Sequence, residues 1–365
     1  MRQKRSTKLL SLFLSLTLLL STFTGTMAFA AKDTGASAFA GGAGTVEDPY
    51  EITTVAQLRA IRNDLEASYR LGKSLTLPEG NWEPIGKMDA EFKGTFDGAN
   101  YTISGLTQDD RYADRLGLFG YMRDASVSNL LVEVDFISGH NLVGGIAGYA
   151  VGGAILNCGV VGMDEDSYIS ATNTNLGGLV GEAHRTVIDG CFTSIDVLGD
   201  VSCSPVGGLV GAYNGEKTNM EYGTEDAIKN CFTTGNVRSG SSSAGGLVGA
   251  LNGASMFNCF ATGNISTNGS SSQFVGGLVG SMKSDNVGST GYKHAGTVEN
   301  CYFAGAVQEG GAGAVAYLFG EGTGAGVNYY NDAIENGFNQ VQKCEEPVDL
   351  TPKSIEEMQS EAFVE

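Results

Sequence analysis

The chain has 365 residues, of which 54 are glycine and only 6 are proline, and its formal net charge is −19. Glycine without a strict triplet period excludes a collagen helix, and a hydrophobic share of 42% excludes a disordered chain. No lysine and arginine cluster occurs beyond residue 30, so we expect no binding to nucleic acid or to an anionic membrane surface.

Residues 1–30 have the pattern of a secretory signal peptide. Four basic residues lie among the first eight, residues 9–20 form a leucine-rich apolar run, and Ala-Phe-Ala at 28–30 fits a cleavage site. The apolar run is short for a membrane-spanning helix. We therefore expect cleavage after residue 30 and a mature chain that is secreted or at the cell surface, with no membrane insertion.

Residues 31–42 are predicted to be a small, polar and flexible leader, and residues 43–107 an entry segment. Short strands are expected near 50–52, 75–77 and 101–103. Between the first two, the pattern predicts an amphipathic helix over 55–68, with Leu58, Ile61 and Leu65 on one face. Such a helix would cover the open end of a strand stack, which otherwise promotes aggregation.

A repeat follows, with one motif that is rich in glycine and a second that contains cysteine. Gly-Gly-Leu-Val-Gly occurs unchanged at 177–181, 207–211, 245–249 and 276–280, with degenerate copies at 117–120, 144–148 and 317–320. From its last glycine to the next cysteine there are ten residues in three copies, and twenty or twenty-one in two others. Two units therefore carry an insertion at the same point.

The repeat predicts an all-β parallel β-helix over 108–335. Units of about 28–42 residues contain two or three short apolar strands each and no helical stripe, so a unit buries its apolar face only by stacking on its neighbours. About seven coils are expected. A β-sandwich or a β-propeller is the alternative, although propeller blades need about 40–50 residues each. The motif glycines suit tight corners or positive φ, and the asparagine that precedes most of the repeat cysteines suits an interior amide ladder or a turn.

Five of the seven cysteines occupy the same repeat position: Cys158, Cys191, Cys231, Cys259 and Cys301. They should form one interior column of free thiols, because five parallel side chains in a column cannot all pair. Cys203 and Cys344 lie off this column, and the sequence does not pair them.

The repeat resembles the GLUG-motif family of bacterial secreted and surface proteins. The resemblance rests on the Gly-Gly-Leu-Val-Gly strings and on a lead-in that includes Trp82-x-Pro84-Ile85-Gly86 and the segment 92–106, and it extends over about 41–364. It implies a right-handed β-helix in an exported or surface-displayed, adhesin-like protein. It supplies no catalytic residues.

Residues 336–365 are predicted to be an acidic tail with a short capping helix near 351–363, where Ser354 and Glu357 have capping-box spacing. Relatives of this type continue beyond such a segment, so the sequence also suggests a truncated chain.

Catalytic and metal-binding patterns are sparse. The three histidines are far apart and none is followed by glutamate, which argues against a zinc peptidase helix, and no nucleophile elbow occurs. The strongest local group is Glu182-x-His184-Arg185 with Asp189, which we expect to be a solvated turn. Residues 164–166 are expected to be a charged loop. No cofactor, metal or catalytic residue is predicted.

The two insertions, 215–226 and 283–294, should project from one face with one coil between them, and insertions on one face of a solenoid often mark its binding face. Tyr222 and Tyr292 would be their exposed aromatic residues and are the candidate ligand-binding residues. Tolerated loop decoration is the alternative.

The sequence thus favours an exported, non-catalytic module that binds glycans or host or neighbour proteins. A structural stalk and a carbohydrate-active β-helix enzyme are the alternatives, and the oligomeric state stays open.

Overall fold

The computed structural model describes part of the chain. The described residues are 39–215, 227–240, 243–267, 274–283, 285–286, 293–294, 298–308, 314–316, 319–321, 327–331 and 349–353. They belong to one compact unit that spans Ser37–Glu365. The predicted signal peptide and leader, up to residue 38, Cys344 and most of the predicted tail lie outside them.

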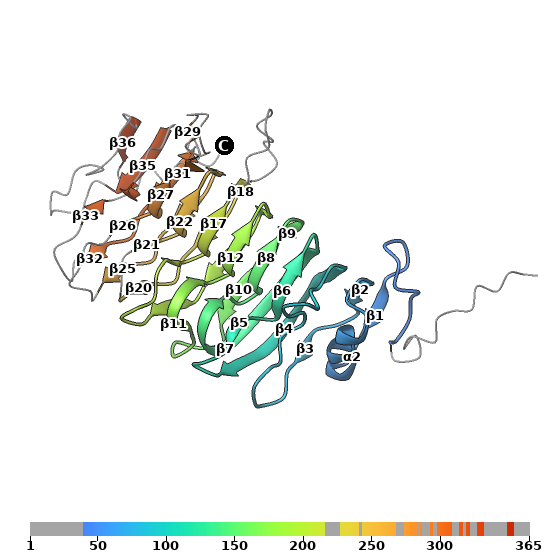
Figure 1. Cartoon of the computed structure of the whole chain (residues 1–365). Helices are drawn as coiled ribbons and strands as arrows, with labels where there is room; N and C mark the ends of the chain where they lie inside the picture. Colours follow the sequence, from blue (N-terminus) through green and yellow to red (C-terminus); the bar gives the residue numbers. More distant parts are fainter. Residues whose placement is uncertain are drawn as a thin grey trace, which may run out of the picture. The chain divides into compact units, whose positions relative to one another are not determined.

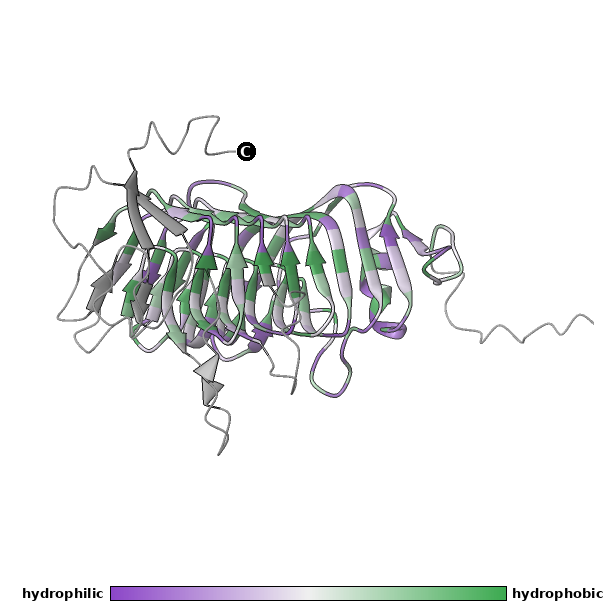
Figure 2. Ribbon diagram, turned by 90° about the horizontal axis from the view of Figure 1, so that it is seen from above, coloured by the Kyte–Doolittle hydropathy of each residue, from purple (hydrophilic) through white to green (hydrophobic). Residues whose placement is uncertain are grey.

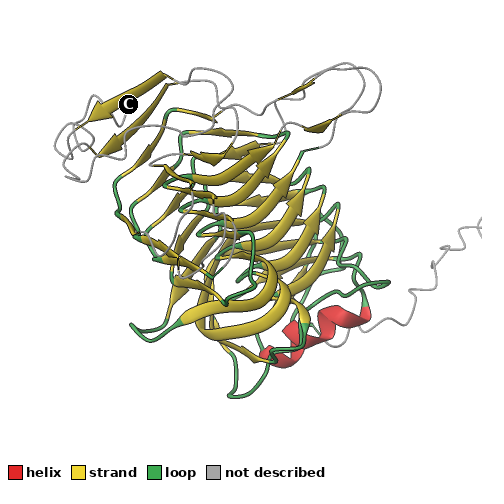
Figure 3. Ribbon diagram, turned by 60° about the vertical axis from the view of Figure 1, so that its left-hand side comes forward, coloured by secondary structure: helices red, strands yellow, loops and turns green. Residues whose placement is uncertain are grey.

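The fold of this unit is a parallel β-helix, which confirms the all-β expectation (Figures 1 and 3). Each coil contains up to five short strand segments rather than two or three. Equivalent segments of successive coils pair in parallel and form five ladders, which we number in the order in which the chain passes through them. Three long strands, β4 (Thr95–Asp109), β7 (Ser126–Val143) and β11 (Tyr168–Gly177), each contribute to several ladders.

The first two ladders start in the entry segment. Besides β4 and β7, the first contains β1 (Tyr50–Ile52), β2 (Ser68–Leu71), β9 (Ala154–Leu156), β13 (Val187–Asp189), β18 (Ala227–Lys229), β23 (Ser255–Phe257) and β30 (Val298–Glu299). Besides β4 and β7, the second contains β3 (Leu75–Thr76), β10 (Gly159–Gly162), β14 (Phe192–Ser194), β19 (Phe232–Thr233), β24 (Phe260–Ala261), β31 (Cys301–Phe303), β35 (Val327–Asn331) and β36 (Asp349–Lys353).

The third and fourth ladders share β7 and β11. The third also contains β4, β15 (Asp196–Gly199), β20 (Val237–Ser239), β25 (Ile265–Thr267) and β32 (Val307–Gln308). The fourth also contains β5 (Asp114–Leu116), β16 (Val206–Gly207), β21 (Ser243–Gly245), β26 (Phe274–Gly276) and β33 (Ala314–Ala316).

The fifth ladder is a separate seven-stranded sheet with one strand from each of the seven predicted motif copies. Its strands are β6 (Phe119–Arg123), β8 (Ala147–Val151), β12 (Val180–His184), β17 (Val210–Asn214), β22 (Val248–Asn252), β27 (Val279–Lys283) and β34 (Phe319–Glu321). All seven copies therefore form coils, with six turns from the first strand to the last.

Backbone crowding explains the motif glycines. A Cβ on Gly208 would lie 2.1 Å from the carbonyl oxygen of Gly246, one coil further on. A Cβ on Gly207 would lie 2.0 Å from the carbonyl oxygen of Val210. Neither glycine has a positive φ. Of the two reasons that the sequence left open, the tight corner between the fourth and fifth ladders is therefore the one that applies here.

The asparagines before the cysteines are left-handed corner residues between the first and second ladders. Asn157, Asn230 and Asn258 all have φ of 52°, a conformation that asparagine tolerates better than most residues. Their exposed amides also bond from coil to coil, as between Asn258 Nδ2 and Asn230 Oδ1 at 3.1 Å. The amide ladder thus exists, but it lies on the outside of the coil and not in the interior.

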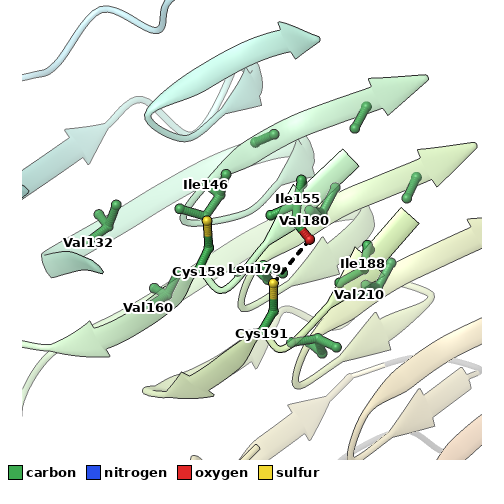
Figure 4. Close-up of a cluster of buried hydrophobic side chains, with 14 of the residues drawn as sticks. Val132, Ile146, Ile155, Cys158, Val160, Leu179, Val180, Ile188, Cys191 and Val210 are labelled. Carbon is green, nitrogen blue, oxygen red and sulfur yellow. Dashed lines mark hydrogen bonds between the residues drawn. The ribbon is translucent and has the colours of Figure 1, made fainter. Parts of the chain in front are cut away.

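The core is one continuous apolar column along the coil axis (Figure 4), and apolar residues recur at equivalent places of successive coils (Figure 2). The five aligned cysteines lie in it as predicted, all buried free thiols. The Cys191 amide nitrogen is 3.4 Å from the sulfur of Cys231, and the Cys191 thiol donates to the Ile155 carbonyl at 3.3 Å. Cys203 is also a buried free thiol.

The N-terminal helix is shorter than the predicted span of 55–68. α2 covers Val55–Ala60 and continues as a single 3-10 turn, η2 (Ile61–Asn63). It begins in a capping box between Thr54 and Gln57. It ends because Asp64 is extended and the chain then enters β2, which pairs with β1. Leu58 and Ile61 are fully buried in the core at the N-terminal end of the stack (Figure 3).

Candidate functional site

The two insertions enter the fold at the same corner, between the fifth ladder and the first. One follows β17 and the other β27, and the last residues of β17, β22 and β27 are in register: Asn214, Asn252 and Lys283. One coil therefore separates the insertions. In the second, β28 (Asp285–Asn286) pairs antiparallel with β29 (Lys293–His294). Tyr222 and Tyr292, the candidate ligand-binding residues, lie outside the described residues.

The outward face of the fifth ladder is the most distinctive surface beside these entry points. Alternate residues of each strand point outward, and they align in two columns along the coil axis. The first column runs Tyr121, Tyr149, Glu182, Ala212, Ala250 and Ser281, and the second runs Arg123, Val151, His184, Asn214 and Asn252. The first column thus carries large aromatic or charged residues in three coils and Ala or Ser in the next three, after which Glu321 follows in register.

Glu182 and His184 are the centre of this surface. Both lie on β12, and His184 Nε2 is 2.5 Å from Glu182 Oε1. Because an ionised carboxylate only accepts hydrogen bonds, Nε2 carries the hydrogen. Asn214 Nδ2 donates to the same oxygen at 3.2 Å, and Asn175 Nδ2 donates to the other oxygen. Three donors from three strands therefore fix the carboxylate.

Two tyrosines extend this cluster toward the N-terminal coils. Tyr149 meets the His184 ring edge to face, with centroids 5.3 Å apart, and Tyr121 meets Tyr149 at 4.9 Å. The Arg123 guanidinium lies 5.2 Å from the centre of the Tyr121 ring. Burial raises the pKa of Tyr149, and the negative charge of Glu182 adds to this rise. We call Tyr121, Tyr149, Asn175, Glu182, His184 and Asn214 the Glu182 patch.

Residues of the fourth ladder with a left-handed backbone conformation border the patch. Arg115 and Asn175 have φ of 61° and 53° and precede the last residues of their strand segments. Asn175 binds Glu182, as described above. The buried Nε of Arg115 has no hydrogen-bond partner among the described residues, and the positive charge of Arg115 acts on Tyr149 to lower its pKa, against the larger effect of burial.

Sequence reasoning found this site only in part. Glu182 and His184 were singled out, but the expectation of a solvated turn is wrong: they lie on a strand, and their side chains are 18% and 32% exposed. Asp189 is not part of the cluster, because its carboxylate accepts from Asn230 Nδ2 at 2.7 Å on the first ladder. Tyr121 and Tyr149 were missed. Alignment of the repeat units at the last motif glycine would have shown them, since the next residue is Ala or Ser in the three coils after Glu182.

The arrangement suits binding more than catalysis. The Glu182 patch contains one carboxylate, whereas glycoside hydrolysis ordinarily needs two that flank the bond. In the described parts of the chain, no three His, Cys, Asp or Glu side chains come together as a metal site. The Asp164 carboxylate is occupied in its own turn, where it accepts from Ser167 Oγ at 3.1 Å and from the Asp166 amide at 3.0 Å.

A second aromatic surface, on the second ladder, is structural. The rings of Phe192, Phe232, Phe260 and Tyr302 stack at 4.9–5.1 Å with interplanar angles of 3–8°. Each inner ring thus has both faces covered by its neighbours. Only the ring edges are left for a ligand, so this stack does not offer the open faces on which sugar rings pack.

The family comparison matches one coil of the stack. A model described as the GLUG motif matches residues 240–266. This chain therefore contains a GLUG motif at residues 240–266. The matched segment contains one strand from each ladder, β21 to β25, so one GLUG motif corresponds to one complete coil. The equivalent glycine corner of this coil, Gly245 and Gly246, lies within it.

Two relatives match parts of the chain. Halomucin from Haloquadratum walsbyi is 36% identical over 156 residues, which are 38% of this chain and 2% of halomucin. A "Putative Gly-rich membrane protein" from Evansella cellulosilytica is 37% identical over 124 residues, which are 31% of this chain and 14% of that protein. This chain therefore aligns with only a small part of either relative.

Two solved structures share the fold. The first is described as a "putative immunoglobulin A1 protease" from Bacteroides ovatus, with TM-score 0.51, 18% identity and 88% of each chain covered. The second is named "IgA1 Protease", with TM-score 0.50 and 20% identity, and covers 78% of this chain and 22% of that one. At this identity the likeness shows the β-helix fold alone.

Together these findings describe a β-helix module of the surface-protein type. In the described parts of the chain, no helix has the length and apolar character needed to span a membrane.

Proposed function

We propose that this chain is an exported, non-catalytic binding module of the cell surface, and that the Glu182 patch and the two neighbouring insertions form its binding face. The observation that carries the proposal is the break in the repeat: the outward column of the fifth ladder carries Tyr121, Tyr149 and Glu182 in three coils and Ala or Ser in the next three. A repeat that served only to stack would not need large polar groups at these positions.

The chemistry of the patch supports binding. Glu182 is held by His184, Asn175 and Asn214, so its carboxylate is preorganised as an acceptor and loses little freedom when a ligand binds. Tyr149 adds a half-buried aromatic ring with a hydroxyl group, a residue type that is enriched where proteins bind ligands. The surface location is supported by the two relatives and by the predicted signal at 1–30.

A structural spacer in a longer surface protein is the second candidate. The small share of each relative that the match covers favours it, since a module repeated within a long protein can serve as a stalk. A spacer needs no binding face, so a binding experiment separates the two candidates.

The test is a glycan array together with immobilised mucin, probed with purified residues 31–365. Three variants are compared: Tyr149→Ala, Glu182→Ala, and a deletion of 215–226 with 283–294. Thr234→Ala, an exposed change on the second ladder, is the matched control.

We expect intact protein and the control to bind, and the three variants to lose at least most of that binding. Circular dichroism confirms that each variant is folded. A folded intact chain that binds none of these probes would contradict the proposal for glycan and mucin ligands and favour the spacer.

A further inference from the structure

A hollow lies on the outward face of the third ladder, away from the Glu182 patch. Its floor is an outward column in which Asp109, Ser138, Ser170, Leu198 and Arg238 are consecutive register partners. The hollow has a volume of about 510 Å³. A second hollow of about 550 Å³ continues it and shares four lining residues: Asp109, Arg111, Thr172 and Asp200. Together they form one trough that runs along the coil axis across several coils. Its size is that of a small-molecule or oligosaccharide site rather than an ion site.

Two ordered turns form the rims of the trough. In the turn at 110–113, the Ala113 amide bonds to the Asp110 carbonyl at 2.9 Å, and the Tyr112 amide bonds to the Asp110 carboxylate at 3.1 Å. In the turn at 200–204, the Cys203 amide bonds to the Asp200 carbonyl at 2.8 Å, and the buried Cys203 side chain anchors the turn in the core. The rims are therefore in place before a ligand arrives.

An ion pair joins the rims across the trough. Arg111 Nη2 lies 2.8 Å from Asp200 Oδ2, although the two residues belong to coils that are separated by the strands of Ser138 and Ser170. Both side chains are well exposed, at 60% and 44%, so the pair adds little to stability. Its evident effect is to place a guanidinium and a carboxylate over the floor.

The lining balances its charges. Asp109, Asp110 and Asp200 line the trough together with Arg111, Arg238 and His140, so it offers both charged donors and charged acceptors without an excess of arginine over aspartate. A phosphate or sulfate ligand would call for an excess of cations. An added peptide strand would need a free sheet edge. The floor strands from β7 to β20 are already paired on both sides, and the backbone of Asp109 on β4 already bonds to the Asn81 side chain.

Aromatic rings complete the chemistry. Tyr168 lies in the lining and stacks on Phe136, with ring centroids 5.9 Å apart. Tyr112, on the rim, is 92% exposed. An exposed tyrosine above a trough of hydroxyl groups, carboxylates and guanidinium groups matches the two needs of a sugar: an apolar ring face to cover and hydroxyl groups to bind.

We propose that this trough binds a neutral oligosaccharide that lies along the coil axis, with a sugar ring against Tyr112 and its hydroxyl groups bonded to Asp109, Asp200 and Arg238. The site is distinct from the Glu182 patch, which lies on the fifth ladder. It gives the chain a glycan contact that does not depend on the insertions.

The experiment compares immobilised neutral and acidic oligosaccharides as probes for purified residues 31–365, followed by isothermal titration with the strongest soluble neutral probe. The variants are Tyr112→Ala, Asp109→Asn and Arg238→Gln, whose side chains are exposed, so the fold should be kept. Val46→Ala, an exposed apolar residue in the entry segment, is the matched control. Tyr149→Ala reports on the Glu182 patch.

We expect binding of neutral probes, a loss of about tenfold in affinity for Tyr112→Ala, and losses of similar size for the other two trough variants. Val46→Ala should bind as the intact chain does, and any loss through Tyr149→Ala measures the share of neutral-probe binding that belongs to the Glu182 patch. The inference is overturned if no neutral oligosaccharide binds, if only acidic ones bind, or if the trough variants bind normally. Loss through Tyr149→Ala alone would support the Glu182 patch and refute the trough.

Discussion

The glycine corner between the fourth and fifth ladders gives the sharpest test of the fold, through the substitution Gly208→Ala. The new Cβ would lie 2.1 Å from the carbonyl oxygen of Gly246, whereas real Cβ contacts do not fall below 3.0 Å. The obstacle is backbone of the next coil and not the end of a flexible side chain. Neighbouring coils are held at the spacing of paired strands, about 4.8 Å, so the chain cannot open the gap at this point alone.

The cost follows from the bonds that meet at Gly208. Its amide donates to the Gly245 carbonyl at 3.2 Å, and its carbonyl accepts from the Gly178 amide at 3.1 Å and from Thr193 Oγ1 at 2.8 Å. Weakening these bonds costs about 1 kcal/mol each, and overpacking adds about 1–3 kcal/mol. We therefore expect Gly208→Ala to lower the free energy of unfolding by about 2–5 kcal/mol, against a total of about 5–15 kcal/mol for a typical domain.

Urea-induced loss of the β-sheet circular dichroism signal measures this difference, through the shift of the unfolding midpoint at constant slope. Gly41→Ala is the matched control, because its Cβ would meet nothing closer than a flexible Glu51 carboxylate oxygen at 3.5 Å and its φ is not positive. If the free energies of unfolding of Gly208→Ala and Gly41→Ala differ by less than about 0.5 kcal/mol, the account of the motif glycines as close-approach positions is refuted.

Four further predictions concern Cys203, Thr54 and Asn258. Burial raises the pKa of Cys203 to about 12, so Cys203 should not react with a thiol reagent at pH 8 in the native chain, whereas it should in the unfolded chain; rapid labelling of native Cys203, located by peptide mass mapping, would contradict this. Between pH 9 and 12 the folded state keeps a Cys203 proton that the unfolded state releases, so the contribution of this thiol to stability should fall as pH rises, as measured by urea midpoints across that range. Thr54→Ala removes the capping box with Gln57 and should cost about 1 kcal/mol, and an unchanged midpoint would show that the helix contributes little. Asn258→Ala loses both the amide bond to Asn230 and the favoured left-handed corner, and should cost about 1–2 kcal/mol; Asn258→Gly, which keeps the corner, should recover part of that loss.

Most of the fold could be predicted from the regular spacing of the repeat motifs. Identical strings at regular spacing predicted the stacking of coils, and the aligned positions of Cys191 and Cys231 predicted the thiol column, because equivalent residues of successive coils must lie above one another. The two insertions occur at the same point of their repeat units, which likewise predicted that they leave the coil at the same corner. Local patterns were weaker: the helix predicted to Ser68 ends in the 3-10 turn at Asn63, because pairing of β2 with β1 overrides helix propensity.

The number of bends per coil could not be read from the strings. The bend between the first and second ladders depends on one residue in the left-handed conformation, such as Asn258, and a single residue leaves little trace in an apolar pattern. The sequence left open whether these asparagines form an interior amide ladder or a turn. Only the paired coils show that the same side chain makes the corner and bonds along the outside.

The Glu182 patch and the trough are formed by residues that only the tertiary structure brings together. Glu182 meets His184 within one strand, which the sequence could suggest, but it meets Asn175 and Asn214 only because the fourth ladder bulges and the next coil stacks in register. Arg111 and Asp200 are 89 residues apart in the chain and still form an ion pair. Sequence alone determined that similar units stack, since each must bury its apolar face against the next. Which side chains then become neighbours was decided by the unequal loops between the ladders, because loop length sets where each coil turns and the repeat motif does not encode it.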